Sequence, residues 1–439
     1  MEALTPSAGA TRKRYIVVAL LFVTVTINYL DRSNLSIAAA GITSDFQLSP
    51  AQLGWIFSAW GWAYAVCQIP GGWLADRFTP RRLAALLIFT WSLATLALGV
   101  AGGFTSLIAL RFMIGMLEAP SYPINNRVVT TWFPETERAR AIATYTSAQF
   151  VGLAFLTPLL SWLLANFGWH SVFLFSGGMG LIWSVIWYVW YREPKDFPGV
   201  NSDALSLIRE GGGIPDLQDR LKKAQQRQDA PFRWRDLFFL LSQRKLWGLY
   251  LGQFGLGGTT LFFLTWFPTY LVQYKHMQFI KAGFAASIPF LFGFLGVLAA
   301  GILSDYLLKR GYGVGAARKI PVVCGLLLST TILGANFVDD QRLVIFFMTI
   351  AFFGTGLASI VWSLVSAIAP ERLIGLTGGV FNFIGGLSGI IVPIGIGYLA
   401  DGSNFAPALI FVSCLTLLGA FSYGVLIGKV ERLDVEDSI

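Results

Sequence analysis

Long apolar stretches separated by short polar segments run through the whole 439-residue chain. A helix needs about 20 predominantly apolar residues to cross the hydrocarbon core of a bilayer. Twelve stretches approach or exceed that length, so the pattern predicts twelve transmembrane helices. They are expected at residues 14–40, 51–76, 83–103, 105–131, 138–165, 172–191, 246–274, 281–308, 318–338, 341–369, 372–400 and 404–428.

The composition agrees with a protein whose main solvent is lipid. Hydrophobic residues make up 55% of the chain and charged residues 13%, whereas soluble domains are about 25% charged. The mean hydropathy is +0.63. We therefore expect an all-α membrane protein without a sizeable soluble domain. The sequence contains no nucleotide-binding P-loop, catalytic triad or metal-ligand pattern, so we expect no enzyme activity, no cofactor and no metal site.

The basic residues indicate the orientation in the membrane. The net charge is +8, but these residues flank hydrophobic segments, which favours a lipid bilayer as partner over nucleic acid. With the N-terminus inside, the inner segments hold 26 of the 32 lysines and arginines and the outer loops hold three. The positive-inside rule therefore places both termini in the cytoplasm.

The polar stretch 192–245 is expected to be a cytoplasmic linker between two six-helix bundles. This division gives an N-terminal bundle at 1–191 and a C-terminal bundle at 246–439. The linker ends in the segment Phe232-Arg-Trp-Arg-Asp-Leu-Phe-Phe-Leu-Leu. Its mixture of aromatic residues and arginines predicts a short helix on the inner leaflet.

A short internal repeat supports the division into halves. Gly72-Trp-Leu-Ala-Asp76-Arg77 ends the second predicted helix, and Gly301-Ile-Leu-Ser-Asp305 ends the eighth. In each copy a glycine precedes the aspartate by about one helical turn and allows close helix packing. We expect Asp76, Arg77 and Asp305 to control conformational gating on the cytoplasmic side. An ordinary positive-inside loop is the alternative.

Four ionisable residues lie deep inside predicted transmembrane helices: Asp31, Arg32, Arg111 and Glu118. Such residues are costly at membrane depth and usually mark an ion or substrate path. Asp31 and Arg32 are about 100° apart around their helix and cannot point the same way. We expect Asp31 to face Arg111, and Arg32 to face the centre with Glu118.

These four residues suit the coupled transport of an anion and protons. An arginine can hold a carboxylate through two parallel hydrogen bonds. Burial favours the neutral form of a carboxyl group and a neighbouring arginine favours the ionised form, so an acid whose arginine is taken by substrate can bind a proton. Purely structural ion pairs are the alternative.

Two groups of motifs resemble a known family. The Gly-x-x-x-Asp-Arg repeat resembles the signature of the major facilitator superfamily. Asn28-Tyr-Leu-Asp31-Arg32-Ser-Asn-Leu-Ser and Arg111-Phe-Met-Ile-Gly115-Met-Leu-Glu118-Ala-Pro resemble its anion:cation symporter branch. Segments beginning at Thr146, Phe262, Trp362 and Leu373 are similar to the sugar-acid carriers of this branch.

The resemblance implies a secondary active transporter that takes up a sugar-acid anion with protons by alternating access. D-Galactonate is the first candidate substrate, and glucarate, galactarate, a hexuronate or anion exchange are alternatives, with a transporter-like nutrient sensor more remote. The chain is expected in a bacterial inner membrane as a multi-pass monomer. Asp31, Glu118 and Arg111 are expected to couple protons. The expected substrate-binding residues are Arg32, Tyr64, Glu118, Gln253, Ser359, Trp362 and Asn382. For the polar ones, plain interhelical hydrogen bonding is the alternative.

Overall fold

The fold is described here from a computed structural model that covers residues 11–217, 234–370, 373–400 and 404–433. Nine helices in this part of the chain are long and apolar enough to cross a membrane. The remaining three spans contain helix breaks or lower hydropathy. Together they give the twelve-helix membrane fold expected from the sequence, with both termini in the cytoplasm.

The first six spans come from seven helices, because the fourth span is broken. The spans are α1 (Arg14–Phe46), α2 (Pro50–Arg77), α3 (Pro80–Leu98), α4 and α5 (Phe104–Glu118 and Ser121–Trp132), α6 (Glu135–Phe167) and α7 (Trp169–Trp190).

The second six spans are less regular. The seventh combines α11 (Arg244–Leu261), the π-helical turns η1 (Phe262–Trp266) and η2 (Tyr270–Tyr274), and α12 (Phe267–Thr269) between them. Next come α13 (Phe279–Lys309), α14 with η3 (Val314–Ser329, Thr330–Asn336), and α15, η4 and α16 (Gln341–Leu357, Ala358–Val361, Trp362–Ile368). The last two are α17 and α18 (Ile374–Gly386, Ser388–Leu399), and α19 with η6 (Ala406–Phe421, Ser422–Leu426).

The fourth span differs from the single helix predicted at 105–131. Regular helix ends at Glu118 and resumes at Ser121, with Pro120 between them. Proline lacks an N–H group and its ring clashes with the preceding turn, so it ends the helix. The break places Glu118 at the last position of α4.

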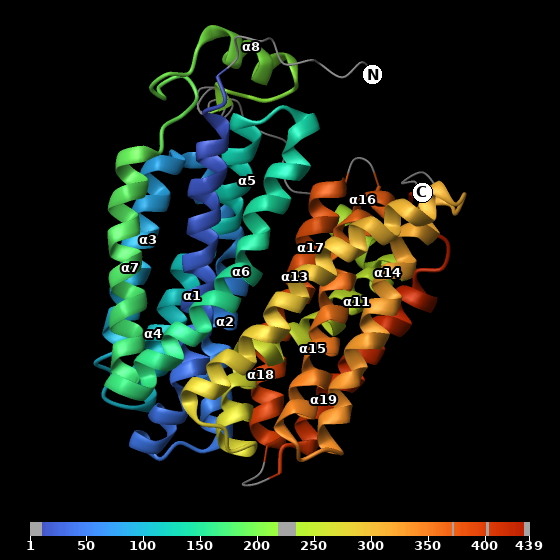
Figure 1. Ribbon diagram of the computed structural model, residues 1–439. Coiled ribbons are helices and arrows are strands. Elements are labelled where there is room, and N and C mark those ends of the chain that lie inside the picture. The colour runs from blue at the N-terminus through green and yellow to red at the C-terminus, as the bar shows by residue number, and fades with distance from the viewer. Residues whose placement is uncertain (1–10, 218–233, 371–372, 401–403, 434–439) are drawn as a thin grey trace.

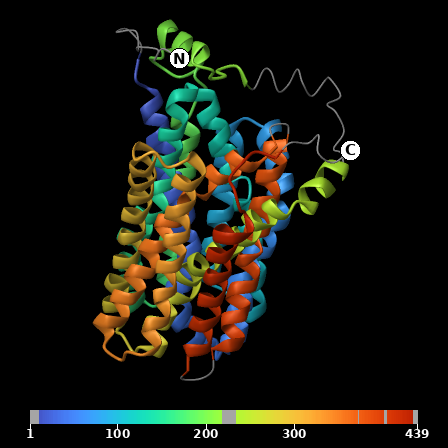
Figure 2. The ribbon, with the colours of Figure 1, turned by 90° about the vertical axis from the view of Figure 1, so that its right-hand side faces the viewer.

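The two bundles converge at the extracellular side and diverge toward the cytoplasm (Figure 1). The view turned by 90° shows the second bundle in front (Figure 2). Helix α2 packs against α18, and α6 packs against α13, across the boundary between the bundles. A Cβ atom at Gly54 of α2 would lie 2.5 Å from the carbonyl oxygen of Pro393, so only glycine permits this approach.

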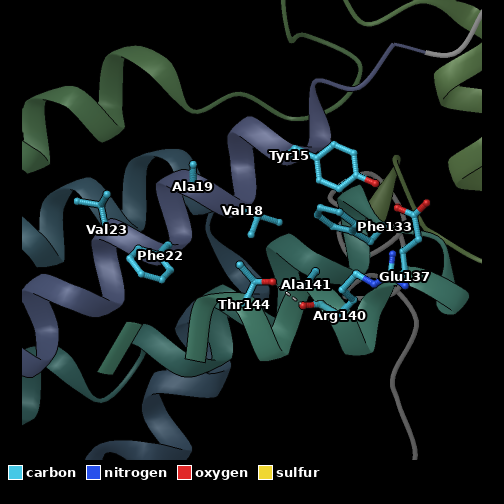
Figure 3. A pocket seen from close by; sticks show the side chains of 10 residues that line it. All are labelled: Tyr15, Val18, Ala19, Phe22, Val23, Phe133, Glu137, Arg140, Ala141 and Thr144. Atoms are coloured by element: carbon cyan, nitrogen blue, oxygen red, sulfur yellow. Dashed lines mark hydrogen bonds between the residues drawn. The ribbon is translucent and has the colours of Figure 1, made fainter. Parts of the chain in front are cut away.

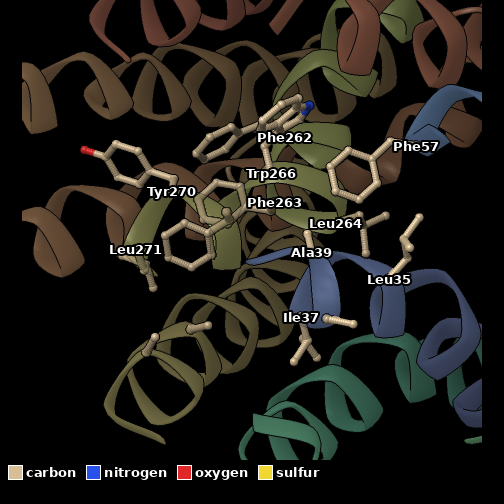
Figure 4. Packing of buried hydrophobic residues seen from close by; sticks show 14 of the residues in the cluster. Leu35, Ile37, Ala39, Phe57, Phe262, Phe263, Leu264, Trp266, Tyr270 and Leu271 are labelled. Carbon is tan, nitrogen blue, oxygen red and sulfur yellow. The ribbon is translucent and has the colours of Figure 1, made fainter. Parts of the chain in front are cut away.

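The hydrophobic clusters also reflect the contact between the bundles at their outer ends and their separation toward the cytoplasm. The largest cluster contains residues of both bundles near their outer ends (Figure 4), with Leu35 of α1 and Phe57 of α2 beside the aromatic residues of η1. The rings of Phe57 and Trp266 meet edge to face at 5.4 Å. Two further clusters belong to one bundle each, toward the cytoplasm. The protein is therefore closed on the outer side, in an inward-facing arrangement.

The linker contains two short helices in its described part, α8 (Ser202–Glu210) and α10 (Trp234–Ser242). Helix α10 corresponds to the predicted amphipathic segment, and its Trp234 and Phe238 are strongly exposed. Residues 218–233 lie outside the described part. The domain boundaries placed at 191 and 246 remain predictions.

Candidate functional site

Arg32 lies in α1 among aromatic rings. Its guanidinium carbon is 4.7 Å from the ring centre of Tyr29, 4.4 Å from that of Trp60 and 5.1 Å from that of Tyr64. The Trp60 and Tyr64 rings stack on each other at 4.4 Å. The Arg32 side chain is only 11% exposed. Cation–π attraction is strongest where water is excluded, so these rings fix the position of the positive charge.

Glu118 accepts two hydrogen bonds on the same carboxylate oxygen. Arg32 Nε donates to Glu118 Oε2 at 3.4 Å, and Trp60 Nε1 donates to it at 3.0 Å. Glu118 is fully buried, and among the described residues its Oε1 and the Nη2 of Arg32 have no hydrogen-bond partner. The buried ion pair of Arg32 and Glu118 thus leaves a hydrogen-bond donor and an acceptor available.

The helices approach closely at this site because Gly115 has no side chain. A Cβ atom there would clash with the main-chain carbonyl of Trp60. Gly115 lies three residues before Glu118 on α4, and Trp60 carries the ring that contacts both charges. The contact between α2 and α4 therefore sets the distance between Trp60 and Glu118.

Arg111 and Asp31 form the second half of the cluster, in a geometry the sequence did not indicate. Arg111 Nη1 donates to the main-chain oxygen of Asp31 at 3.1 Å, not to its carboxylate. Within the described residues, no ion pair within 4 Å joins these two side chains. Arg111 is nevertheless near enough to attract both Asp31 and Glu118 electrostatically.

The Asp31 carboxylate instead faces polar groups inside the first bundle. Its Oδ1 accepts from Asn34 Nδ2 at 3.4 Å, and the same amide donates to Ser176 Oγ of α7 at 3.1 Å. Asp31 is fully buried, and its Oδ2 has no hydrogen-bond partner in the described part of the chain. Two acids and two arginines thus share one buried region with balanced charge.

Four of the predicted substrate-binding residues belong to the second bundle. Gln253 lies on α11 against Gly385 of the eleventh span, and its buried Oε1 has no hydrogen-bond partner among the residues that the structure describes. Trp362 begins α16, is 46% exposed and meets the ring of Phe381 at 5.0 Å. Ser359 is half-buried in η4 and Asn382 is exposed on α17. Of the predicted substrate-binding residues, Arg32, Glu118 and Tyr64 lie together in the first bundle. The other four lie in the second bundle.

The predicted gating residues are only partly described. The side chains of Asp76 and Asp305 lie outside the described part of the structure, and Arg77 is exposed at the last position of α2. Arg127 of α5 reaches the same helix end, where its Nη1 donates to the carbonyl oxygens of Ala75 and Phe78. A cation at this position satisfies carbonyl groups that a helix C-terminus leaves unpaired.

Sequence reasoning missed several residues of the site. Trp60, Tyr29 and Asn34 contact the charged groups directly, and Tyr122 donates to the hydroxyl of Tyr29 at 3.3 Å. A usable signal was present for Tyr29 and Trp60. Tyr29 precedes Arg32 by three positions on one helix face, and Trp60 precedes Tyr64 by four.

Comparison with known proteins places this geometry in a family. The model of the family described as Major Facilitator Superfamily matches residues 21–393. A D-galactonate transporter of Escherichia coli O6:H1 is 50% identical over 433 residues, which cover 99% of this chain and 100% of the relative. A probable galactarate/D-glucarate transporter of Bacillus subtilis is 42% identical, with 98% of this chain and 95% of the relative covered.

Solved structures support the fold independently. A bacterial homologue of the human lysosomal transporter Spinster, in an inward-facing and occupied conformation, superposes with a TM-score of 0.73 at 18% identity. The match covers 95% of this chain and 97% of the other. The inward-open xylose transporter of Escherichia coli gives a TM-score of 0.70 at 13% identity, covering 95% and 97%.

Proposed function

The chain belongs to the Major Facilitator Superfamily, and we propose that it takes up D-galactonate, a sugar-acid anion, together with protons. The protein is a membrane transporter rather than an enzyme. The substrate proposal is supported by the 50% identity to a D-galactonate transporter over the whole length of both chains.

The observation that carries the proposal is the buried pair of Arg32 and Glu118. Among the described residues, the buried Nη2 of Arg32 has no hydrogen-bond partner, and an arginine binds a carboxylate best through two parallel hydrogen bonds. In the proposal, the substrate carboxylate binds Arg32 in competition with Glu118. The ring of Tyr64 faces Arg32, so Tyr64 is positioned to contact a substrate bound there.

Proton coupling follows from this competition. When substrate takes Arg32, Glu118 loses its counter-charge in a buried site and binds a proton, because burial disfavours an unpaired carboxylate. Asp31 is the second proton carrier, and Arg111, which attracts both acids, links the two. Release of substrate inside returns Arg32 to Glu118 and drives the proton off.

Residues of the second bundle complete the proposed transport cycle. Gln253, Ser359, Trp362 and Asn382 bind the substrate hydroxyls as the bundles close around it. Asp76, Arg77 and Asp305 gate the cytoplasmic side. The bundles at 1–191 and 246–439 rock about the site, and the protein works as a monomer in the inner membrane of a bacterium.

A second candidate substrate is a hexarate dianion, since a probable galactarate/D-glucarate transporter is 42% identical. A dianion would need a second cation, and Arg111 is bonded to a main-chain carbonyl instead of facing Arg32 as a free donor. This bond favours the monoanion. Exchange of one anion for another is a further mechanism that the same arginine could serve, and nutrient sensing is a more remote function.

Uptake by the purified protein in sealed liposomes tests the proposal. Labelled D-galactonate should accumulate when a pH gradient, alkaline inside, is imposed, and a protonophore should abolish accumulation. Competition between unlabelled galactarate and labelled D-galactonate tests whether the substrate is a dianion. Accumulation without any gradient dependence would contradict proton coupling, and stronger binding of galactarate would contradict the choice of substrate.

A further inference from the structure

A groove of about 420 Å³ lies between the cytoplasmic ends of α1 and α6, apart from the buried charged site around Arg32 and Glu118. Figure 3 shows that its walls change character along its length. Val18, Ala19, Phe22 and Val23 of α1 form the deeper, apolar part. Arg140 and Glu137 of α6 lie at the other end. Cavities of roughly 300–1,000 Å³ hold drug-sized ligands, so the groove is large enough for part of a lipid.

The groove opens toward lipid. Thr144 lines it, and Phe155 and Trp162 lie 11 and 18 residues further along α6, which is close to three and five whole turns. All three side chains therefore share one helix face. Phe155 is 70% and Trp162 46% exposed. Large apolar side chains so exposed on a membrane-spanning helix face the hydrocarbon region, and the groove continues this face at the inner leaflet.

Among the described side chains at the polar end of the groove, one positive charge is uncompensated. Glu137 is bound by Arg14 through two hydrogen bonds, Nε to Oε2 at 2.7 Å and Nη2 to Oε1 at 3.0 Å, which neutralises the acid. Arg140 is exposed. Within the described residues its guanidinium has neither a hydrogen bond nor a carboxylate within 4 Å.

We propose that this groove binds an anionic phospholipid of the inner leaflet, with an acyl chain between α1 and α6 and the phosphate on Arg140. Charge complementarity selects this occupant, because the cytoplasmic leaflet carries anionic lipids and basic pockets between transmembrane helices bind their head groups. The apolar wall accounts for the acyl chain, which a free phosphate ion would leave unused. The lipid would hold α1, which carries Arg32, against α6, which packs on the second bundle.

Lipid retention by the full-length protein tests this site. The wild type, Arg140→Gln, and the matched control Arg310→Gln are reconstituted in nanodiscs of phosphatidylethanolamine with increasing phosphatidylglycerol, and bound lipid is counted by native mass spectrometry. Arg310 is an exposed arginine at the cytoplasmic end of α13. Arg140→Gln should raise the half-saturating phosphatidylglycerol fraction about fivefold, the factor for one basic residue near an anionic surface.

Two further arms make the test decisive. Ala19→Trp fills the apolar wall without changing charge and should also reduce retention, whereas inorganic phosphate should not displace the lipid. The melting temperature of each variant checks folding. Equal retention by the wild type and Arg140→Gln would overturn the site, as would equal retention of phosphatidylcholine and phosphatidylglycerol. Displacement by inorganic phosphate would reduce the site to an anion site without an acyl chain.

Discussion

The guanidinium of Arg32 lies against the rings of Tyr29, Trp60 and Tyr64. Its Nε donates to Glu118, so the charge and the Nη2 group both have fixed positions. A lysine at this position would keep the charge and lose the planar fork. It would also lose stacking on the Trp60 ring. Binding therefore depends on the shape of the cation as well as on its sign.

Replacement of Arg32 by lysine should weaken D-galactonate binding by tenfold or more, because charge-assisted hydrogen bonds contribute about 1.5–3 kcal/mol each. Equilibrium binding to the detergent-solubilised protein measures this. Arg310→Lys, a change at an exposed arginine, is the control and should bind as the wild type does. Wild-type affinity in Arg32→Lys would move the carboxylate site elsewhere.

The substitution Glu118→Gln should abolish proton-driven uptake, while exchange of internal for external substrate should continue. The amide mimics the protonated acid and cannot release a proton. Uptake under a pH gradient and counterflow without one are the two measurements. Concentrative uptake at the wild-type level would exclude Glu118 as a proton carrier.

The substrate class can be tested at the same residue. A neutral sugar such as D-galactose that displaced Glu118 from Arg32 would supply no counter-charge in its place, and a buried charge left unpaired costs several kcal/mol. D-Galactose and galactitol should therefore compete poorly with labelled D-galactonate. Inhibition by galactitol comparable to that by unlabelled D-galactonate would argue against an anion site.

At the scale of elements, the positions of the spans were predictable and their interruptions were not. A bilayer requires about 20 apolar residues per helix, which is a strong constraint readable from one sequence. The break after Glu118 and the π-helical turns on either side of Pro268 follow from single prolines and local packing. Pro120 could be read from the sequence, but its effect could not be predicted, because proline is tolerated in transmembrane helices.

The same limit applies within the site. The pairing of Arg32 with Glu118 could be expected from helix angles, because adjacent residues on α1 must diverge. The bond from Arg111 to the main chain of Asp31 could not, since it depends on how closely α1 and α4 approach. The Asn34 bridge to Ser176 likewise depends on the packing of α7.

The contact between α2 and α4 yields a prediction of its own. Gly115→Ala places a methyl group against the carbonyl of Trp60 and should cost about 1–3 kcal/mol, as overpacking does. Both the melting temperature and the affinity for D-galactonate should fall. Gly178→Ala is the matched control, a helical glycine with open space around it. Unchanged affinity in Gly115→Ala would show that this contact does not position Trp60.

At the scale of the molecule, the two bundles meet along their outer halves and part toward the cytoplasm. Trp55 Nε1 donates to the Tyr398 hydroxyl at 3.3 Å, and Thr269 Oγ1 donates to the Ser36 carbonyl at 3.3 Å. Both bonds join the bundles at their outer ends. Opening to the outside must break them and separate the shared apolar core.

Gly54→Trp should shift the protein toward an outward-facing state, because Gly54 contacts the main chain of Pro393 and leaves no room for a side chain. A shift from mostly inward to mostly outward requires about 5.5 kcal/mol. Electron–electron distances between spin labels on the outer ends of α2 and α18 should lengthen, and uptake should stop. Gly178→Trp is the control. Unchanged distances with normal uptake would contradict the closed outer contact.

The outer boundary between α2 and α18 is largely a contact of bare backbone, with Gly54 on Pro393, Gly61 on Gly389 and Gly397 on Pro50. These backbone contacts can part without any side chain changing rotamer, so they add little steric resistance to opening. The interactions that opening must disrupt at this boundary include the Trp55–Tyr398 hydrogen bond and the shared apolar core. In the proposed cycle, the loaded carrier differs from the empty one at Arg32 and Glu118, and the backbone contacts are the same in both.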